Sequence, residues 1–171
     1  MNTIEKAREF AARCHGVQLY GKVPYIKHLE DVYRIAKSIT TNENIHIAAF
    51  LHDVIEDTKC TYQDVVAKFG KEVAELVYAV TDEIGRNRVE RKEKTYPKIA
   101  ESADAITLKI CDRLANFEAA HDNNYNKYEM YSEEHFEFCV ELNLCNLSEI
   151  DAHRIGFEKL EAISRIKREY I

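Results

Sequence analysis

The chain has 171 residues, 46% of them hydrophobic, which is enough to close one core without disulfides or a structural metal, so we expect a single domain over residues 1–171. The formal net charge of -6 argues against the broad basic surface that tracks a nucleic-acid backbone, and we expect no nucleic-acid partner. The five cysteines are scattered and form no CxxC pair, which predicts neither a disulfide framework nor a thiolate zinc site and favours a reducing, cytoplasmic environment. No segment has the apolar length of a signal-peptide core or a membrane span, so we expect no membrane association.

Apolar residues recur at helical spacing almost throughout, which predicts an all-α helical bundle and leaves little room for strands. In the first half the pattern predicts, in chain order, a helix over about 3–16 capped by Thr3, a loop over 20–24, a buried central helix over 45–55, and helices over 61–70 and 73–81. In the second half it predicts a loop or an exposed helix over 82–98, a buried helix over 106–120, and helices over 125–147 and 149–170.

The predicted central helix carries His52 and Asp53 side by side, with Glu56 and Asp57 one turn later. Helical spacings of three and four residues would place these four groups along one edge. Next to the apolar run AAFL, such charges would cost roughly several kcal/mol each unless a cation or hydrogen bonds compensate them. A bound metal ion supplies that compensation, whereas the plainer alternative is a solvated helix face.

Two residues in other predicted elements favour the metal: His28, which follows the loop at Pro24, and Asp112, which interrupts an aliphatic helix. With His52 and Asp53 they give two imidazoles and two carboxylates without a thiolate. Such a set suits Mn²⁺, with Fe²⁺, Zn²⁺, Co²⁺ or Mg²⁺ as alternatives. A divalent ion there would acidify a water molecule and withdraw charge from a phosphoryl oxygen, which predicts hydrolysis of a phosphoester or pyrophosphate.

Four segments of the chain resemble, in order and spacing, the HD hydrolase domain of the RelA/SpoT family: PYIKH (24–28), AAFLHDVIEDT (48–58), FGKEVAELVYAVTDE (69–83) and LKICDRLAN (108–116). The resemblance covers about the first 120 residues, the motif-bearing part, and leaves out the predicted C-terminal helices over about 124–171. It implies a small alarmone hydrolase of the HD type. Such an enzyme removes the 3′-pyrophosphate of guanosine tetra- or pentaphosphate (ppGpp or pppGpp) by attack of a metal-bound water.

The same resemblance implies roles for the site residues. It assigns the metal to the four residues already singled out, His28, His52, Asp53 and Asp112. Glu56 and Asp57 would orient or deprotonate the attacking water, with Glu56 as the first choice for the base; solvation of a helix surface is the plain alternative for both. Asn116 follows Asp112 by one turn and would reach a ribose hydroxyl or a phosphate oxygen, or would merely satisfy the backbone.

Substrate contacts are expected from two other places. Basic residues of the polar segment could clamp phosphates, because guanidinium groups match phosphate oxygens, or could be solvated surface; they are Arg86, Arg88, Arg91 and Lys92. Members of the family that this chain resembles carry a basic dipeptide ahead of the PY motif that helps to hold guanine, where this chain has Leu19 and Tyr20. Tyr20 could instead stack on a purine, and Lys22 could supply a nearby positive charge.

Two other functions stay open at this point. The same metal chemistry could act on another nucleotide, for example on the 2′-phosphate of NADPH or on a nucleoside monophosphate. Alternatively, the bundle could bind a nucleotide or a partner protein without turnover. A small-molecule nucleotide is the expected partner, and a homodimer is an option that the sequence leaves open.

Two further groups of residues stand outside the motifs. The tyrosine-rich run over 123–136 could line a nucleotide pocket or pack in a core. Five histidines have no carboxylate company in the matched motifs and receive no metal role: His15, His46, His121, His135 and His153.

Overall fold

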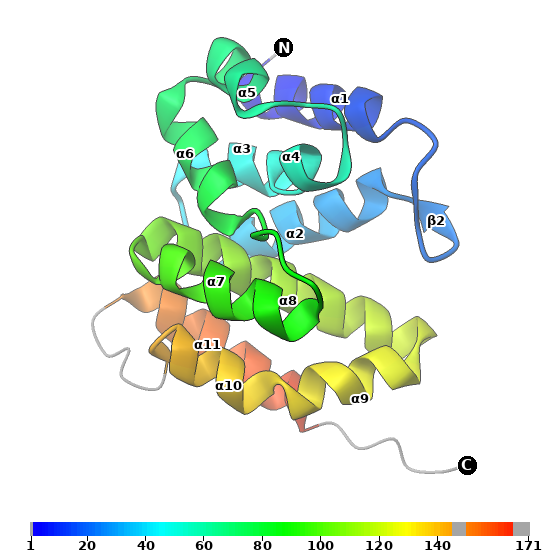
Figure 1. Ribbon diagram of the computed structural model, residues 1–171, viewed down its shortest axis with the longest axis vertical. Helices are drawn as coiled ribbons and strands as arrows, with labels where there is room; N and C mark the ends of the chain where they lie inside the picture. The colour runs from blue at the N-terminus through cyan, green and yellow to red at the C-terminus, as the bar shows by residue number, and fades with distance from the viewer. Residues whose placement is uncertain (1, 145–149, 166–171) are drawn as a thin grey trace.

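The computed structural model describes residues 2–144 and 150–165, and Figure 1 shows that helices make up most of them. The prediction of an all-α bundle is confirmed. The helices of the first half are α1 (Thr3–His15), α2 (Ile26–Ile39), α3 (Glu43–Leu51), α4 (Val54–Asp57), α5 (Tyr62–Phe69) and α6 (Lys71–Val80). Those of the second half are α7 (Arg88–Ala100), α8 (Ala103–Asn123), α9 (Tyr125–Glu133), α10 (His135–Glu141) and α11 (Asp151–Ser164).

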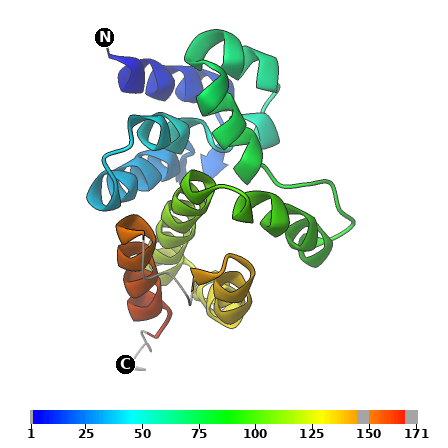
Figure 2. The ribbon, with the colours of Figure 1, turned by 90° about the vertical axis from the view of Figure 1, so that its left-hand side faces the viewer.

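Helix α8, with 21 residues, runs through the middle of the molecule. It packs against α2, α3 and α6 from the first half of the chain and against α7, α9 and α11 from the second. Figure 2 shows the N-terminal helices at one end and α9 to α11 at the other, with α8 between them. The side chains of Leu108, Ile110 and Phe117 on α8 are completely buried. A polar group that points inward from α8 therefore needs a partner from another helix.

The N-terminal region differs from the prediction in two details. Asn2, and not Thr3, caps α1, because its side chain accepts a hydrogen bond from the backbone N–H of Glu5 and Glu5 binds back to the cap. The predicted loop over 20–24 lies in a small antiparallel hairpin of β1 (Leu19–Tyr20) and β2 (Val23–Pro24). Its turn includes Gly21 at φ 63°, a left-handed conformation that costs glycine little.

The predicted central helix over 45–55 is interrupted. Helix α3 ends at Leu51, His52 and Asp53 form a turn, and α4 begins at Val54. The two acids of α4 consequently do not continue one straight edge from the two residues of the turn, as the helical spacing had predicted. The turn places His52 and Asp53 at the end of α3, where side chains from neighbouring helices can contact them.

The polar segment over 82–98 becomes helical only at Arg88, where the Asn87 side chain accepts a hydrogen bond of 2.9 Å from the backbone N–H of Glu90. Helix α7 then continues to Ala100. The alternative of an exposed helix is wrong for its last part, because Tyr96 is only 4% exposed. The first part of α7 is thus partly exposed, and its last part packs against the core.

The predicted helix over 125–147 divides at Glu134 into α9 and α10. Helix α11 lies inside the predicted helix over 149–170. Residues 145–149 and 166–171 lie outside the described residues, and so do the ends of these two predicted helices.

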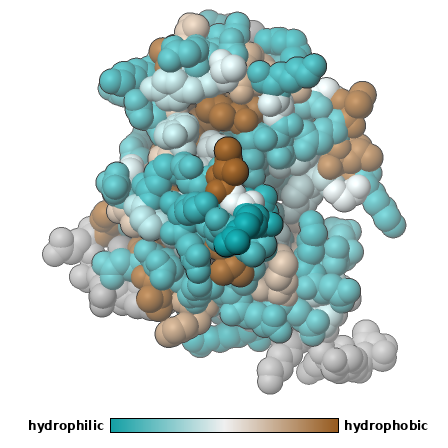
Figure 3. All heavy atoms as spheres, viewed as in Figure 1, coloured by the Kyte–Doolittle hydropathy of each residue, from teal (hydrophilic) through white to brown (hydrophobic). Residues whose placement is uncertain are grey.

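The large apolar side chains that the described residues expose are scattered over the chain. Figure 3 shows a mostly hydrophilic face with scattered apolar side chains. The most exposed large apolar residues come from several elements: Val17, Leu19, Ile84, Val89, Phe136 and Val140. Within the described ranges, no helix combines the length and the hydropathy needed to cross a bilayer.

Candidate active site

The structure brings together the four residues that the sequence singled out for a metal. His28 comes from the first turn of α2, His52 and Asp53 from the turn between α3 and α4, and Asp112 from the middle of α8. The Nε2 atom of His52 lies 3.0 Å from Asp53 Oδ2 and 3.7 Å from Asp112 Oδ1. The Nε2 atom of His28 lies 3.4 Å from Asp112 Oδ1 and 3.7 Å from Asp53 Oδ2. We call these four residues the HD cluster.

The HD cluster fits a divalent cation. His52 Nδ1 donates a hydrogen bond of 3.0 Å to the carbonyl oxygen of Ala49, which leaves the lone pair on Nε2. That Nε2 atom is buried and has no hydrogen-bond partner among residues 2–144 and 150–165. A buried acceptor without a hydrogen-bond donor is rare in proteins. The Nε2 atom of His52 faces carboxylate oxygens, which are acceptors too, and a cation between them would satisfy both. Two imidazole nitrogens and two carboxylate oxygens together suit the ions expected from the sequence.

Neighbouring groups keep both carboxylates of the cluster ionised. Burial alone would raise the pKa of Asp112, but Lys109, whose Nζ lies 3.1 Å from Asp112 Oδ2, helps to hold that pKa well below its usual range. Burial would likewise raise the pKa of Asp53, and the protonated form of the adjacent His52 lowers it below its usual range. The Tyr25 hydroxyl donates a hydrogen bond of 2.7 Å to Asp53 Oδ2. These partners hold two anionic ligands in place.

The two acids of α4 are not equivalent. Both residues are exposed, but Glu56 reaches the cleft beside the cluster, where its Oε2 accepts a hydrogen bond of 3.0 Å from the backbone N–H of Asp82, and partial burial raises its pKa. Asp57 is exposed and accepts a hydrogen bond of 3.0 Å from Gln18 Nε2. Gln18 is held in turn by His15, whose Nδ1 lies 2.8 Å from Gln18 Oε1. The structure therefore directs Glu56 toward the cleft and ties Asp57 to the segment after α1.

A cleft of ≈ 220 Å³ lies over the HD cluster. It is lined by four of the residues expected to bind substrate: Tyr20, Arg88, Lys92 and Asn116. Three others do not line it, since Lys22 is exposed, Arg86 pairs with Glu90, and Arg91 points toward Asp82 at 3.9 Å. Four of the other lining residues were not expected from the sequence: Tyr25, Lys109, Arg113 and Phe138. Tyr131, which also lines the cleft, belongs to the tyrosine-rich run for which a pocket lining was one of two alternatives.

Three cations of the cleft converge on one carboxylate, Glu134. Arg88 Nε lies 2.8 Å from Glu134 Oε1, Arg113 Nη1 lies 3.2 Å from Oε2, and Lys92 Nζ pairs with the same Oε2. Although burial raises the pKa of Glu134, these pairings lower it to about 2. Tyr131 packs under the guanidinium of Arg113, whose carbon lies 4.7 Å from the ring centroid. The tyrosine-rich run thus both packs the core and reaches the cleft.

Tyr20 connects the hairpin to the floor of the cleft. Its ring stacks on His28 at a centroid distance of 4.5 Å and an interplanar angle of 8°. Its hydroxyl donates a hydrogen bond of 2.5 Å to Asn116 Oδ1, and Asn116 Nδ2 donates one of 2.6 Å to Asp112 Oδ1. The stacking and the bonded chain place Tyr20 against the HD cluster.

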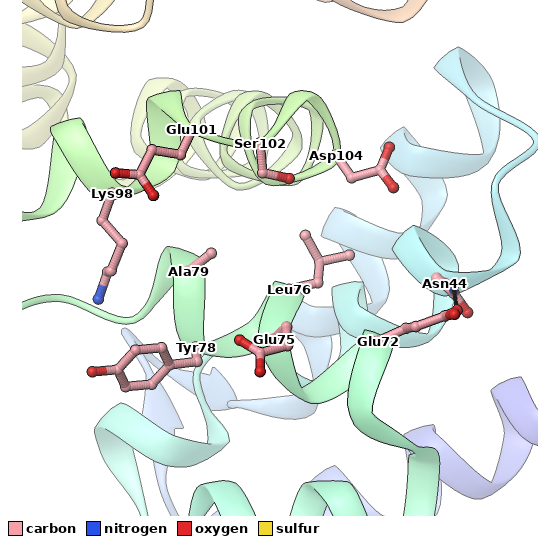
Figure 4. A pocket seen from close by; sticks show the side chains of 10 residues that line it. All are labelled: Asn44, Glu72, Glu75, Leu76, Tyr78, Ala79, Lys98, Glu101, Ser102 and Asp104. Atoms are coloured by element: carbon pink, nitrogen blue, oxygen red, sulfur yellow. Dashed lines mark hydrogen bonds between the residues drawn. The ribbon is translucent and has the colours of Figure 1, made fainter.

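A larger hollow of ≈ 510 Å³ lies elsewhere, between α6 and the junction of α7 with α8. Figure 4 shows its acidic lining, with Glu72 and Glu75 of α6 opposite Glu101 and Asp104. Lys98, the lysine among its lining residues, donates hydrogen bonds to the Thr81 carbonyl oxygen and to Glu83. Among the residues that the structure describes, its lining includes no histidine or cysteine, whereas the smaller cleft contains the HD cluster.

Comparisons with known proteins match most of this chain. A family model described as HD domain matches residues 7–137. The chain is 35% identical over 160 residues to guanosine-3′,5′-bis(diphosphate) 3′-pyrophosphohydrolase of Aquifex aeolicus, a match that covers 90% of this chain and 21% of the relative. It is 37% identical over 98 residues to the MESH1 pyrophosphohydrolase of Drosophila melanogaster, which covers 56% of this chain and 55% of the relative. These matched regions span about a fifth and about half of the two relatives.

A solved structure extends the likeness to the whole fold. It is described as a metazoan ortholog of SpoT that hydrolyses ppGpp, and it superposes with a TM-score of 0.75 at 27% sequence identity. The superposition covers 96% of this chain and 95% of that chain. The motif match, the four converging ligand groups and the superposed helices agree with one another. This chain belongs to the HD domain family.

Proposed function

We propose that this protein is a metal-dependent hydrolase that removes the 3′-pyrophosphate of ppGpp and pppGpp. The observation that carries the proposal is the pairing, within one cleft, of the HD cluster with three cations, Arg88, Lys92 and Arg113. The first group suits a divalent ion, and the second suits the phosphates of a highly charged nucleotide. The relatives named above as pyrophosphohydrolases support this choice of substrate.

Mn²⁺ is the ion we propose for the HD cluster, with Fe²⁺, Zn²⁺, Co²⁺ and Mg²⁺ as alternatives. When bound, such an ion supplies an acidified water and withdraws charge from a phosphoryl oxygen. The four ligands are His28, His52, Asp53 and Asp112. Tyr25 and Lys109 hold the two carboxylates in position and offset their charge.

Glu56 is the residue we propose as the general base. It faces the cleft, and its raised pKa brings a carboxylate closer to the value at which it accepts a proton well near neutral pH. Its hydrogen bond from the backbone N–H of Asp82 fixes one oxygen and leaves the other to orient an attacking water. For Asp57 we propose a positioning role, since it lies at the edge of the site and is bound to Gln18.

Phosphate and nucleoside contacts come from different walls of the cleft. Arg88, Lys92 and Arg113 are placed to hold phosphate oxygens, and the guanidinium groups can do so with two parallel hydrogen bonds. Tyr20 and Asn116 lie on the hairpin side, where they can meet a ribose or a base. Lys22 lies outside the lining, and we propose no direct substrate contact for it.

The test is product release from ppGpp, from NADPH and from nucleoside monophosphates, with Mn²⁺ present. Selective release of pyrophosphate from ppGpp is the expected result. Release of orthophosphate from another nucleotide would keep the site and replace the substrate. Absence of turnover on all of them, with no thermal stabilisation by Mn²⁺, would favour the binding-module alternative.

Two variants separate the roles inside the site. Asp53→Ala should lose both metal and turnover, because it removes a proposed ligand. Glu56→Gln should retain the metal and lose turnover by about 100-fold or more, the contribution expected of a general base. Equal loss of metal in both variants would contradict this division of roles. A homodimer and a cytoplasmic location stay predictions, which size-exclusion chromatography and cell fractionation can test.

A further inference from the structure

A second group of metal-ligating side chains lies away from the HD cluster, between α10 and α11. His135 and Cys139 are one helical turn apart on α10, so their side chains share a face. Glu161 reaches them from α11, 26 positions further along the chain. The potential ligand atoms of all three residues lie within 4.8 Å of one another. His135 received no metal role from the sequence, because Glu161 is on another helix and Cys139 belongs to none of the motifs.

The distances in this group are close to those around a tetrahedral ion. Ligand atoms about 2.0 to 2.3 Å from zinc stand about 3.3 to 3.7 Å apart. The sulfur of Cys139 lies 3.6 Å from His135 Nε2 and 3.7 Å from Nδ1, so the ring would have to turn for Nε2 to face an ion shared with the sulfur. The Nε2 atom lies 2.8 Å from Glu161 Oε1. A metal ion would replace this last hydrogen bond, and the two atoms would separate by about half an ångström.

Burial shields two of the three side chains of this group from solvent. His135 is 7% exposed and Cys139 is 2% exposed, whereas the side chain of Glu161 is 28% exposed. The imidazole and the thiol are therefore shielded, and the carboxylate opens to solvent, where an ion can enter and a water can complete the coordination. The ring of Phe117 stands edge-on to His135 at 6.2 Å and adds an apolar wall.

Only one oxygen of Glu161 is needed by this group. Arg165 pairs with Oε2, while His135 contacts Oε1. Arg165 can thus keep its ion pair and orient the carboxylate when Oε1 coordinates a cation. The donor set of nitrogen, sulfur and oxygen is borderline to soft, which favours Zn²⁺ over Mg²⁺ or Mn²⁺.

We propose that His135, Cys139 and Glu161 form a second metal site, for Zn²⁺, that ties α10 to α11. Binding would deprotonate the Cys139 thiol and release that proton to solvent. The site would act on structure rather than on catalysis. Helix α10 carries Phe138, which lines the cleft. It directly follows Glu134, which pairs with three cations of the cleft. A metal ion that holds α10 in place would therefore hold this side of the cleft in place.

The sulfur distinguishes this site from the HD cluster, which has no thiolate. Titration of the full-length protein with Co²⁺ should produce a near-ultraviolet charge-transfer band from thiolate to cobalt. The band should persist in Asp53→Ala, which disables the HD cluster, and should vanish in Cys139→Ser. Cys60→Ser is the matched control and should keep the band, because Cys60 lies far along the chain, between α4 and α5.

Zinc affinity provides a second readout that does not depend on activity. In the Asp53→Ala background, Zn²⁺ should raise the melting temperature. Glu161→Gln should weaken zinc binding at least about tenfold, because loss of a residue that only supports a metal ligand already weakens metal binding by about 10-fold to 100-fold. Glu161 is partly exposed, so this variant keeps the test open if Cys139→Ser fails to fold. A band that is absent from the wild-type protein, survives Cys139→Ser or disappears in Cys60→Ser would overturn the proposal.

Discussion

Removal of Glu134 should destabilise the protein and make its stability depend on added phosphate. The carboxylate holds Arg88, Lys92 and Arg113, and the side chain of Arg113 is only 6% exposed. Breaking a fully buried ion pair by removing one partner costs about 3–5 kcal/mol. Glu134 itself is 19% exposed and the side chain of Arg88 is 41% exposed, so we reduce the expected cost of Glu134→Ala to about 2–3 kcal/mol.

Inorganic pyrophosphate should reverse much of that loss, because it offers anionic oxygens to the cations that Glu134 leaves behind. A ligand at about 100 times its dissociation constant adds about 2.7 kcal/mol of stability to the state that binds it. Urea denaturation of Glu134→Ala and of the wild-type protein, each with and without pyrophosphate, measures both effects. Glu133→Ala is the control, since Glu133 is exposed and adjacent. Equal stabilisation of both proteins by pyrophosphate, or a loss below about 0.5 kcal/mol in Glu134→Ala, would refute this reasoning.

Three further predictions concern other parts of the molecule. Burial lowers the pKa of Lys92 to about 8, so KM for the phosphorylated substrate should rise as the pH increases through that value. In Lys92→Arg this rise in KM should move to higher pH, because arginine stays charged. Gly156→Ala should reduce stability by about 1–3 kcal/mol in urea denaturation without changing KM, because the added Cβ would stand 2.5 Å from Ile110 Cγ2. Tyr20→Phe should reduce kcat/KM about twofold to tenfold, the worth of one hydrogen bond, by removing the bond to Asn116.

Each of these predictions has its own contrary result. For Lys92, a rise in KM at the same pH in Lys92→Arg as in the wild-type protein would assign the titration to another group. Lys94→Arg is the control, because Lys94 pairs with Glu90 at the surface. For glycine, unchanged stability would mean that α8 and α11 separate at no cost. For tyrosine, an unchanged kcat/KM in Tyr20→Phe would mean that the hydrogen bond to Asn116 contributes nothing to the reaction.

The sequence predicted the helices well where one face alone is buried, and poorly where the chain turns without glycine or proline. The run IHIAAFLHDVI is apolar on both sides of the break at His52, so its pattern contains no sign of a turn. The hairpin was missed because two-residue strands are too short for an alternating pattern. The division of α9 from α10 at Glu134 has a similar cause, since the sequence around it reads as helix throughout.

The candidate site was predictable to the extent that its residues sit in spaced motifs. His28, His52, Asp53 and Asp112 were found together, because each occupies a recognisable place in one of four ordered segments. Arg113 was overlooked, although a lone arginine inside an aliphatic helix is the kind of signal that marked its neighbour. Phe138 could not be found, because an aromatic residue at helical spacing has the same pattern in a core and in a cleft wall. For the same reason the tyrosine-rich run that contains Tyr131 left both alternatives open.

The charges around the cleft have a consequence for how a nucleotide would lie in it. The HD cluster and Glu56 make the floor acidic, while Arg88, Lys92 and Arg113 make the opposite part basic. In the proposed reaction a divalent ion at the HD cluster would offset the charge of the two carboxylates and attract the scissile phosphate, while the cations would hold the phosphates that are not attacked. Glu134 occupies those cations in the free protein, so an incoming polyphosphate has to exchange with it. A phosphate monoester offers fewer charges and fewer oxygens to the cations than a pyrophosphate does, so under the proposed function this exchange should favour substrates with adjacent phosphates over monophosphates.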